Sequence, residues 1–131
     1  PAEADRFRSD SEIRYALALH DISRIGDLVN THVKKFIKND PASLNQLALD
    51  LDKYAVDDQT CRQLAIELSG KAAKEKDAKP EYIATYANLV YKSNGKAEAL
   101  KILDEALLKM EEPESKDYQT LKALRNKIEN S

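Results

Sequence analysis

The sequence predicts an all-α protein of about seven antiparallel helices that stack as helical hairpins. Apolar residues recur at three- and four-residue spacings along most of the 131 residues, which is the spacing of one helix face. Only three Gly and four Pro interrupt the chain, and this favours long helices over many short strands. Ala, Leu, Lys and Glu, which have high helix propensity, dominate the composition.

Length and charge set the class of protein. The chain suits a single domain, 1–131, whose folding buries roughly two thirds of the unfolded surface. Charged residues make up 34% and the net charge is −2, so the basic surface that nucleic acid requires is missing. No run of about 18 apolar residues is present, so we expect no membrane span. The chain begins at Pro1 without an initiator Met or a signal peptide, which predicts a mature or excised fragment.

Residues 1–40 are predicted to form an N-terminal helical hairpin. The first ten residues are polar and are expected to be frayed at their start. A first helix then runs to about His20, and its cap is one of three residues: Ser9, Asp10 or Ser11. A second helix is expected over 21–38, with Gly26 either at a close helix crossing or at a tolerated surface position. The residues expected to face inward are Ile13, Ala16, Leu17, Ile22, Ile25, Val29, Val33, Phe36 and Ile37.

Residues 41–79 are predicted to form a first, degenerate repeat, with helices at about 42–54 and 59–74. Asp57 and Asp58 precede the second of these helices. Because carboxylates complement the helix dipole there, capping is favoured over a catalytic carboxylate pair. The inward-facing residues are predicted to be Leu44, Leu47, Ala48, Leu51, Tyr54, Cys61, Leu64, Ala65, Leu68 and Ala72.

Residues 80–112 are predicted to form a second repeat, and 113–131 a capping helix that Pro113 opens. Pro80 suits a first helical turn, and Asn94-Gly95 supplies positive-φ residues that end a helix. The inward-facing residues are predicted to be Tyr82, Ile83, Tyr86, Ala87, Leu89, Val90, Ala99, Ile102, Leu103, Ala106, Met110, Tyr118, Leu121, Leu124 and Ile128. The alanines among them would let neighbouring helices approach closely.

An internal repeat relates the two units. Ala65, Ile66, Leu68 and Ala72 match Ala99, Leu100, Ile102 and Ala106 at a period of 34 residues. The second unit resembles a degenerate tetratricopeptide repeat at Ile83, Tyr86, Ala87, Val90, Ala99, Leu103 and Ala106. It departs where Ile83 replaces Trp, where Ala87 replaces Gly and where the closing Pro is displaced to Pro113; the first unit has Ser69 in place of a large apolar residue. The resemblance implies a right-handed stack of helical hairpins.

A narrower resemblance concerns the order of LNQLALDL and, further along the chain, YIATYANLVYKSNGKAEALKILDEAL. This order is similar to the helical C-terminal segment of some Bacteroidetes-type thioredoxin-fold proteins. There the segment follows the redox domain of proteins that are usually exported. The resemblance implies an accessory domain of a larger bacterial protein in an extracytoplasmic, periplasmic location. Cys-x-x-Cys is missing from the chain, so no oxidoreductase activity is implied.

No pattern typical of a catalytic, cofactor or metal site is present, so the chain is predicted to be non-catalytic. His20 and His32 lack the spacing of a zinc protease site, and Leu17 and Val29 stand where a di-iron bundle needs Glu. Cys61, the single cysteine, excludes an internal disulfide and is expected to be a buried, inert thiol. No Gly-rich loop could bind phosphate.

The predicted function is recognition of a protein or peptide, including an adjacent domain of its own parent chain. In a stack of helical hairpins the first helix of each pair lines a concave face. The predicted partner-binding residues on that face are Asn45, Gln46, Leu49, Thr85, Asn88, Tyr91 and Lys92. Asn88 stands where peptide-binding repeats hold the peptide backbone, but Ala84 replaces the Lys of a carboxylate clamp, which disfavours that clamp. The alternative is a structural spacer or dimerisation arm without a groove, and the sequence leaves the oligomeric state open.

Overall fold

A computed structural model describes residues 2–54 and 57–131, and these residues form seven α-helices, one π-helical turn and no strand. The helices are α1 (Ala2–Ala18), α2 (Ile22–His32), α3 (Pro41–Tyr54), α4 (Gln59–Ala73), α5 (Pro80–Lys92), α6 (Lys96–Lys109) and α7 (Lys116–Glu129), and the π-helical turn η1 (Val33–Ile37) continues α2. The all-α prediction is therefore confirmed. In the described ranges, none of the helices combines the length and the apolar content that crossing a membrane requires.

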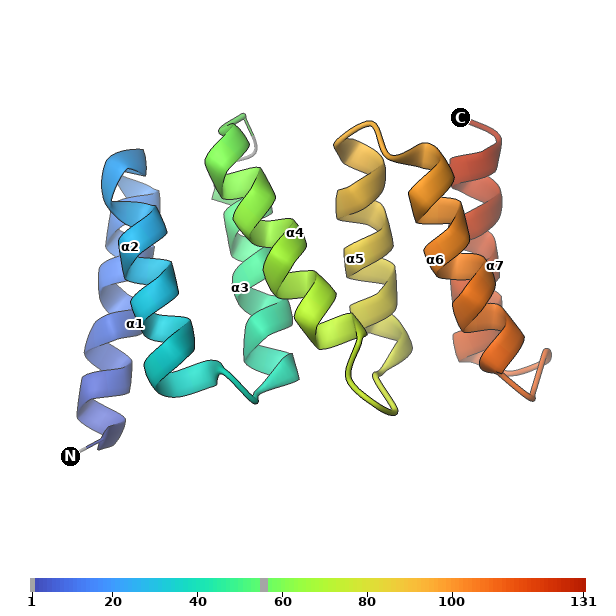
Figure 1. The fold of residues 1–131 in the computed structure, drawn as a ribbon, viewed down its shortest axis with the longest axis horizontal. Helices are drawn as coiled ribbons and strands as arrows, with labels where there is room; N and C mark the ends of the chain where they lie inside the picture. The colour runs from blue at the N-terminus through green and yellow to red at the C-terminus, as the bar shows by residue number, and fades with distance from the viewer. Residues whose placement is uncertain (1, 55–56) are drawn as a thin grey trace.

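The helices stand side by side in a row, with α1 and α2 at one end and α6 and α7 at the other (Figure 1). Helix α3 packs on α4, α4 on α5, α5 on α6 and α6 on α7. Contacts also join helices two apart in sequence, namely α1 with α3, α3 with α5, α5 with α7, and α2 with α4. The odd-numbered helices therefore form one continuous series.

Two clusters of buried apolar side chains make up the core, and they meet at α5. The first cluster extends from Ile13 of α1 to Tyr82 and Leu89 of α5. The second joins other residues of α5 to α6 and α7, and its members are Ala87, Val90, Ala99, Leu103, Leu121 and Ile128. Half-buried Ile66 of α4 packs against both clusters. Helix α5 thus contributes buried residues to both cores, and Ile66 of α4 also joins them.

Most of the residues predicted to face inward are buried or half-buried. Ala87 and Ala99 are fully buried, as the close approach of helices predicts, whereas Ala106 is half-buried. Tyr54 was predicted to face inward, and this is wrong because its side chain is 43% exposed. It is the last residue of α3 and lies beyond Leu51, where the buried face of that helix ends.

The N-terminus differs from the prediction of a frayed segment before a cap at residues 9–11. Helix α1 begins at Ala2, and the acidic Glu3 and Asp5 in its first turn complement the helix dipole. The helix ends at Ala18 rather than at His20, which has a positive φ of 55°. In α2, a Cβ added to Gly26 would meet no atom within 4 Å. Of the two interpretations of Gly26, the tolerated position is therefore correct.

The helix boundaries confirm some predicted signals and correct others. Asp58 caps α4 as predicted, since its Oδ2 accepts a hydrogen bond from the Cys61 N–H at 2.8 Å. At the corner between α5 and α6, Asn94 alone has a positive φ, of 68°. Pro113 does not open the last helix. Ser115 caps α7 instead, because its Oγ accepts from the Tyr118 N–H at 3.1 Å.

Candidate functional site

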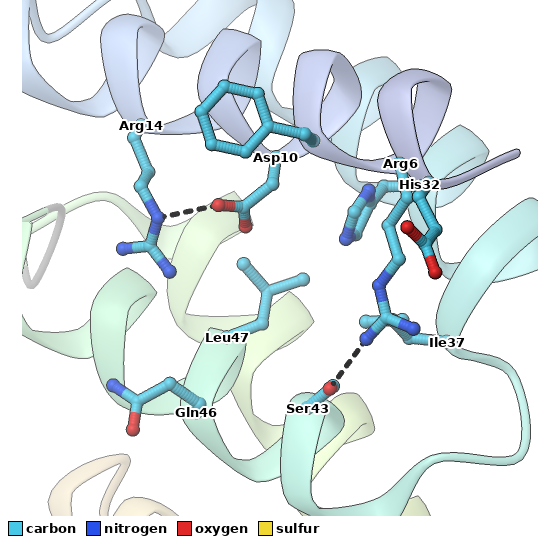
Figure 2. Close-up of a pocket in the computed structure, with 10 residues that line it drawn as sticks. Arg6, Asp10, Arg14, His32, Ile37, Ser43, Gln46 and Leu47 are labelled. Carbon is cyan, nitrogen blue, oxygen red and sulfur yellow. Dashed lines mark hydrogen bonds and ion pairs between the residues drawn. The ribbon is translucent and has the colours of Figure 1, made fainter. Parts of the chain in front are cut away.

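A pocket of about 360 Å³ lies between α1 and α3, and we call it the α1–α3 pocket (Figure 2). Its lining residues are Glu3, Arg6, Phe7, Asp10, Arg14, His32, Ile37, Ser43, Gln46 and Leu47. Phe7 is 74% exposed, so an aromatic ring borders the pocket without being covered by the chain. The pocket thus combines apolar surface with a few polar groups, the composition typical of binding sites.

Two arginines of α1 point toward α3, and both are paired. One terminal nitrogen of Arg6 lies 3.2 Å from Asp40 Oδ2 and 3.1 Å from Ser43 Oγ. Arg14 donates from Nε to Asp10 at 2.9 Å, as Figure 2 shows. Hydrogen bonds from Ser43 lower the pKa of Asp40, and the Arg6 guanidinium lowers it further. Because carboxylates compensate both cations, the pocket is not a bare anion site.

Asp50 is a nearly buried carboxylate beside this pocket, with 7% exposure. Its Oδ1 accepts a hydrogen bond from Gln46 Nε2 at 3.1 Å. Its Oδ2 lies 3.0 Å from Arg14 Nη1. The two groups form an ion pair, but their angle is not that of a hydrogen bond. Arg14 also borders a smaller pocket of about 150 Å³ with Leu17, Ala18 and Tyr54. The hollowed surface therefore continues along the boundary between α1 and α3.

Ser9 and His32 form a hydrogen bond of 2.8 Å between Oγ and Nδ1, the distance expected of a serine nucleophile and its base. Ser9, however, lies in the middle of α1, where neighbouring backbone N–H groups are used by the helix itself. Such a site offers no backbone donors to stabilise an oxyanion. We therefore interpret this pair as a buried polar contact between two helices.

The structure distributes the predicted partner-binding residues over α3 and α5, which pack against each other. On α3, Asn45 is buried at 8% exposure, Leu49 is 40% exposed, and Gln46 faces the α1–α3 pocket instead of α5. On α5, the Thr85 hydroxyl donates to the Glu81 carbonyl of its own helix at 2.9 Å. Asn88 is half-buried.

Two further predicted residues on α5 are tied to other parts of the chain. The Lys92 ammonium is 2.9 Å from Asp52 of α3. The Tyr91 hydroxyl is hydrogen-bonded to the Ser131 hydroxyl. Much of the polar surface of the predicted groove is therefore engaged in contacts within the chain.

The prediction missed the α1 side of the candidate site, because the first helix was expected to begin only after a cap at residues 9–11. Arg6, Asp10 and Arg14 recur every four residues, with Phe7 beside them. Opposite charges at this spacing support a helix, and the signal could have extended the first helix to the N-terminus.

A larger pocket of about 610 Å³ lies where the α4–α5 loop meets α5 and α6. Ile83, Tyr86, Ile102 and Met110 contribute its apolar surface, and charged side chains of the loop and of α6 surround it. The Lys74 ammonium lies 5.5 Å from the centre of the Tyr86 ring, a cation–π distance.

The chemically reactive groups do not gather into a centre. Cys61 is 1% exposed, and burial, followed by the Asp58 carboxylate, raises its pKa to about 12. A thiol in that state is inert at neutral pH. Over residues 2–54 and 57–131, no group of three or more His, Cys, Asp or Glu side chains is placed to hold a metal ion.

No protein-family model, no curated protein and no solved structure matches this chain. The tetratricopeptide and thioredoxin-associated resemblances therefore stay predictions.

Proposed function

We propose that the chain is a non-catalytic protein-interaction module whose helices pair as antiparallel, tetratricopeptide-like hairpins in a right-handed stack. Short connections between consecutive helices support antiparallel neighbours. The contacts of α1 with α3, α3 with α5 and α5 with α7 support a stack in which the first helices share one face. This face is the proposed binding surface for a protein or peptide.

The observation that carries the proposal is the α1–α3 pocket with Phe7 at its border. Leaving 74% of a phenylalanine side chain in water keeps apolar surface hydrated that a partner could cover. Beside it, Gln46 offers an exposed side-chain amide that can fix the orientation of a peptide. We propose that an apolar side chain of the partner packs on Phe7 while its backbone runs along the α1–α3 boundary.

The residues on the α3–α5 side would extend the same surface. Leu49 is partly exposed and Asn88 is half-buried, so both can contact a chain that lies across α3 and α5. Four further residues of α3 and α5 would support these contacts with their polar side chains, namely Asn45, Thr85, Tyr91 and Lys92.

We further propose, from the sequence resemblance, that the module is an accessory domain of a larger bacterial protein, with a thioredoxin-fold domain and an extracytoplasmic location. An adjacent domain of the parent chain would then be one natural partner. Determining the coding sequence on both sides of this chain tests the idea directly, and neighbouring domains without a thioredoxin fold contradict it.

The binding proposal is tested by selecting peptides on the immobilised full chain and measuring their affinity by calorimetry. Phe7→Ala should weaken binding by at least about fivefold, the loss typical of an interface residue that matters. Leu108→Ala is the matched control, since Leu108 is 86% exposed on α6, away from the proposed surface. The double variant Asn88→Ala/Tyr91→Ala tests the α3–α5 side. Equal loss in the Leu108 variant, or none in either test variant, contradicts the proposal.

The second candidate function is a dimerisation arm. It is favoured by Tyr15 at 64% exposure and Leu19 at 59%, which leave further apolar surface of the N-terminal hairpin uncovered. Light scattering should then show a dimer that dissociates on dilution and is weakened by Tyr15→Ser. A strictly monomeric chain at high concentration excludes this function.

A further inference from the structure

His32 is a buried histidine at the point where α2 passes into η1. Its side chain is 4% exposed, and its ring centroid lies 5.6 Å from that of Phe36. Its Nδ1 is 2.8 Å from the hydroxyl of Ser9 on α1. His32 therefore links α1 to the rest of the chain through a part-buried hydrogen bond at the edge of the α1–α3 pocket.

The half of α1 that this contact holds has few other attachments. From Ala2 to Glu12 no residue of α1 is fully buried, and the first buried one is Ile13. Arg6 also attaches this half to Asp40 and Ser43, and the Arg6 and Asp40 side chains are well exposed, at 46% and 39%. Solvent screens a pair of that kind strongly, and the contact between Ser9 and His32 is the less exposed of the two.

The charged side chains that act on the His32 ring belong to α1, and the arginines among them pair with carboxylates at Asp40 and on α3. Asp10 favours a protonated imidazole, whereas Arg6 and Arg14 oppose it. Asp10 is bonded to Arg14, which also pairs with Asp50, and Arg6 pairs with Asp40. Glu3 lines the same pocket, and Lys34 and Lys35 of η1 are exposed. The carboxylates near His32 are therefore largely engaged by arginines already.

We propose that His32 fastens the N-terminal half of α1, residues 2–12, at neutral pH and that mild acidification releases it. Protonation leaves the bond to Ser9 possible, because Nδ1–H can donate to the serine oxygen. The effect comes instead from burying an imidazolium, which loses hydration; the Asp10 carboxylate offsets part of this cost, and the guanidinium groups of Arg6 and Arg14 add to it. Separation of the N-terminal half of α1 from the end of α2 would expose the ring and hydrate the charge. Ile13, Ala16 and Leu17 would keep the second half of α1 packed.

The direction of the pH dependence follows from burial, which lowers the pKa of His32 below its ordinary 6.5. The released state then binds the proton more readily than the packed state. The packed state has its full stability above 6.5 and loses stability as the pH falls through that value toward the lower pKa. Asp40 has a pKa lowered from 3.8, so its own contribution is lost only at lower pH.

An NMR titration of the full chain from about pH 7.5 to about pH 5, the range in which histidine titrates, tests the proposal. We expect the His32 ring signal to titrate below 6.5, and the amide signals of residues 2–12 to shift or broaden along the same curve. His32→Asn, which keeps a polar atom near the Nδ1 position, should remove the response of α1. The matched control is His20→Asn, since His20 is exposed and has a positive φ that Asn tolerates. This control should retain the response.

A His32 that titrates at or above 6.5 in the natural chain overturns the proposal, whatever the variants do. A response of α1 that persists in His32→Asn, or that disappears in His20→Asn, overturns it as well. The readout needs no binding partner, so the result is independent of the proposed recognition function.

Discussion

The Nζ of Lys92 lies 2.9 Å from the Oδ2 of Asp52, forty residues earlier in the chain. This ion pair joins the C-terminal part of α5 to the same part of α3, across the surface that sequence periodicity assigns to partner binding. The lysine side chain is 44% exposed and the aspartate 19%, so water and salt still reach the pair. Such a pair contributes little to the free energy of unfolding, and its main effect is to orient the two helices.

We therefore expect a small coupling energy between Lys92 and Asp52. A double-mutant cycle with Lys92→Met and Asp52→Asn, measured by urea unfolding, should give about 0.2–1 kcal/mol and less at high salt. A coupling well above this range that does not respond to salt would mean that the pair is effectively buried.

Gly95 and Gly26 should respond in opposite ways to alanine. A Cβ at Gly95 would lie 2.8 Å from Val90 Cγ1 and 2.9 Å from the Val90 backbone oxygen. Since the backbone atom cannot turn aside, Gly95→Ala should destabilise the chain by about 1–3 kcal/mol. Gly26 lies inside α2, and a Cβ there meets nothing within 4 Å. Gly26→Ala should therefore stabilise the chain by about 0.5–1 kcal/mol. Thermal unfolding of both variants measures the contrast, and a change of the same sign in both would contradict it.

Cys61 should react with thiol reagents only when the chain unfolds. Its pKa is raised to about 12 from 9.0, chiefly by burial, so the folded protein holds a neutral thiol at neutral pH. Labelling in increasing urea should follow the unfolded fraction reported by circular dichroism. The neutral thiol also contributes stability below pH 9.0, and this contribution should be lost as the pH rises from there toward 12. Fast labelling without urea would show that the site is open.

The buried side chain of Asn45 should make the folded chain less stable than an apolar side chain of similar shape would. Its Oδ1 is buried and has no hydrogen-bond partner in the described part of the chain. Asn45→Leu, similar in shape, removes the unpaired group and should stabilise the fold by about 1–3 kcal/mol in chemical denaturation. Asn45→Asp is the control of equal size, and it should destabilise because it buries a charge. Destabilisation by Leu would indicate that the amide is satisfied.

Much of the fold could be predicted from the sequence, because helix periodicity and caps are local properties. Asp58 and Pro80 mark helix starts that the structure confirms. The errors occur where a tertiary contact or a competing cap determines where a helix begins. Arg6 reaches Asp40 and Ser43, contacts that a helix pattern alone does not show, and Ser115 rather than Pro113 caps the last helix.

The candidate site was less predictable, because a pocket depends on the distance between helices that are far apart in sequence. The positions of Asn45, Gln46 and Leu49 on α3 follow from periodicity, but the pocket that Gln46 lines against α1 does not. The pocket between α1 and α3 brings Phe7 to within reach of Leu47, forty residues away. Only the packing of whole helices determines that distance.

Helix α5 contributes Tyr82 and Leu89 to one core and Ala87 and Val90 to the other. The cooperativity of thermal unfolding should therefore depend on how strongly α5 couples the two cores. Weakening α7 would leave the N-terminal core intact, so that the two ends unfold at separate temperatures. A comparable defect within α5 would collapse both halves in one step, as neighbouring units in a linear array do when their common boundary is lost.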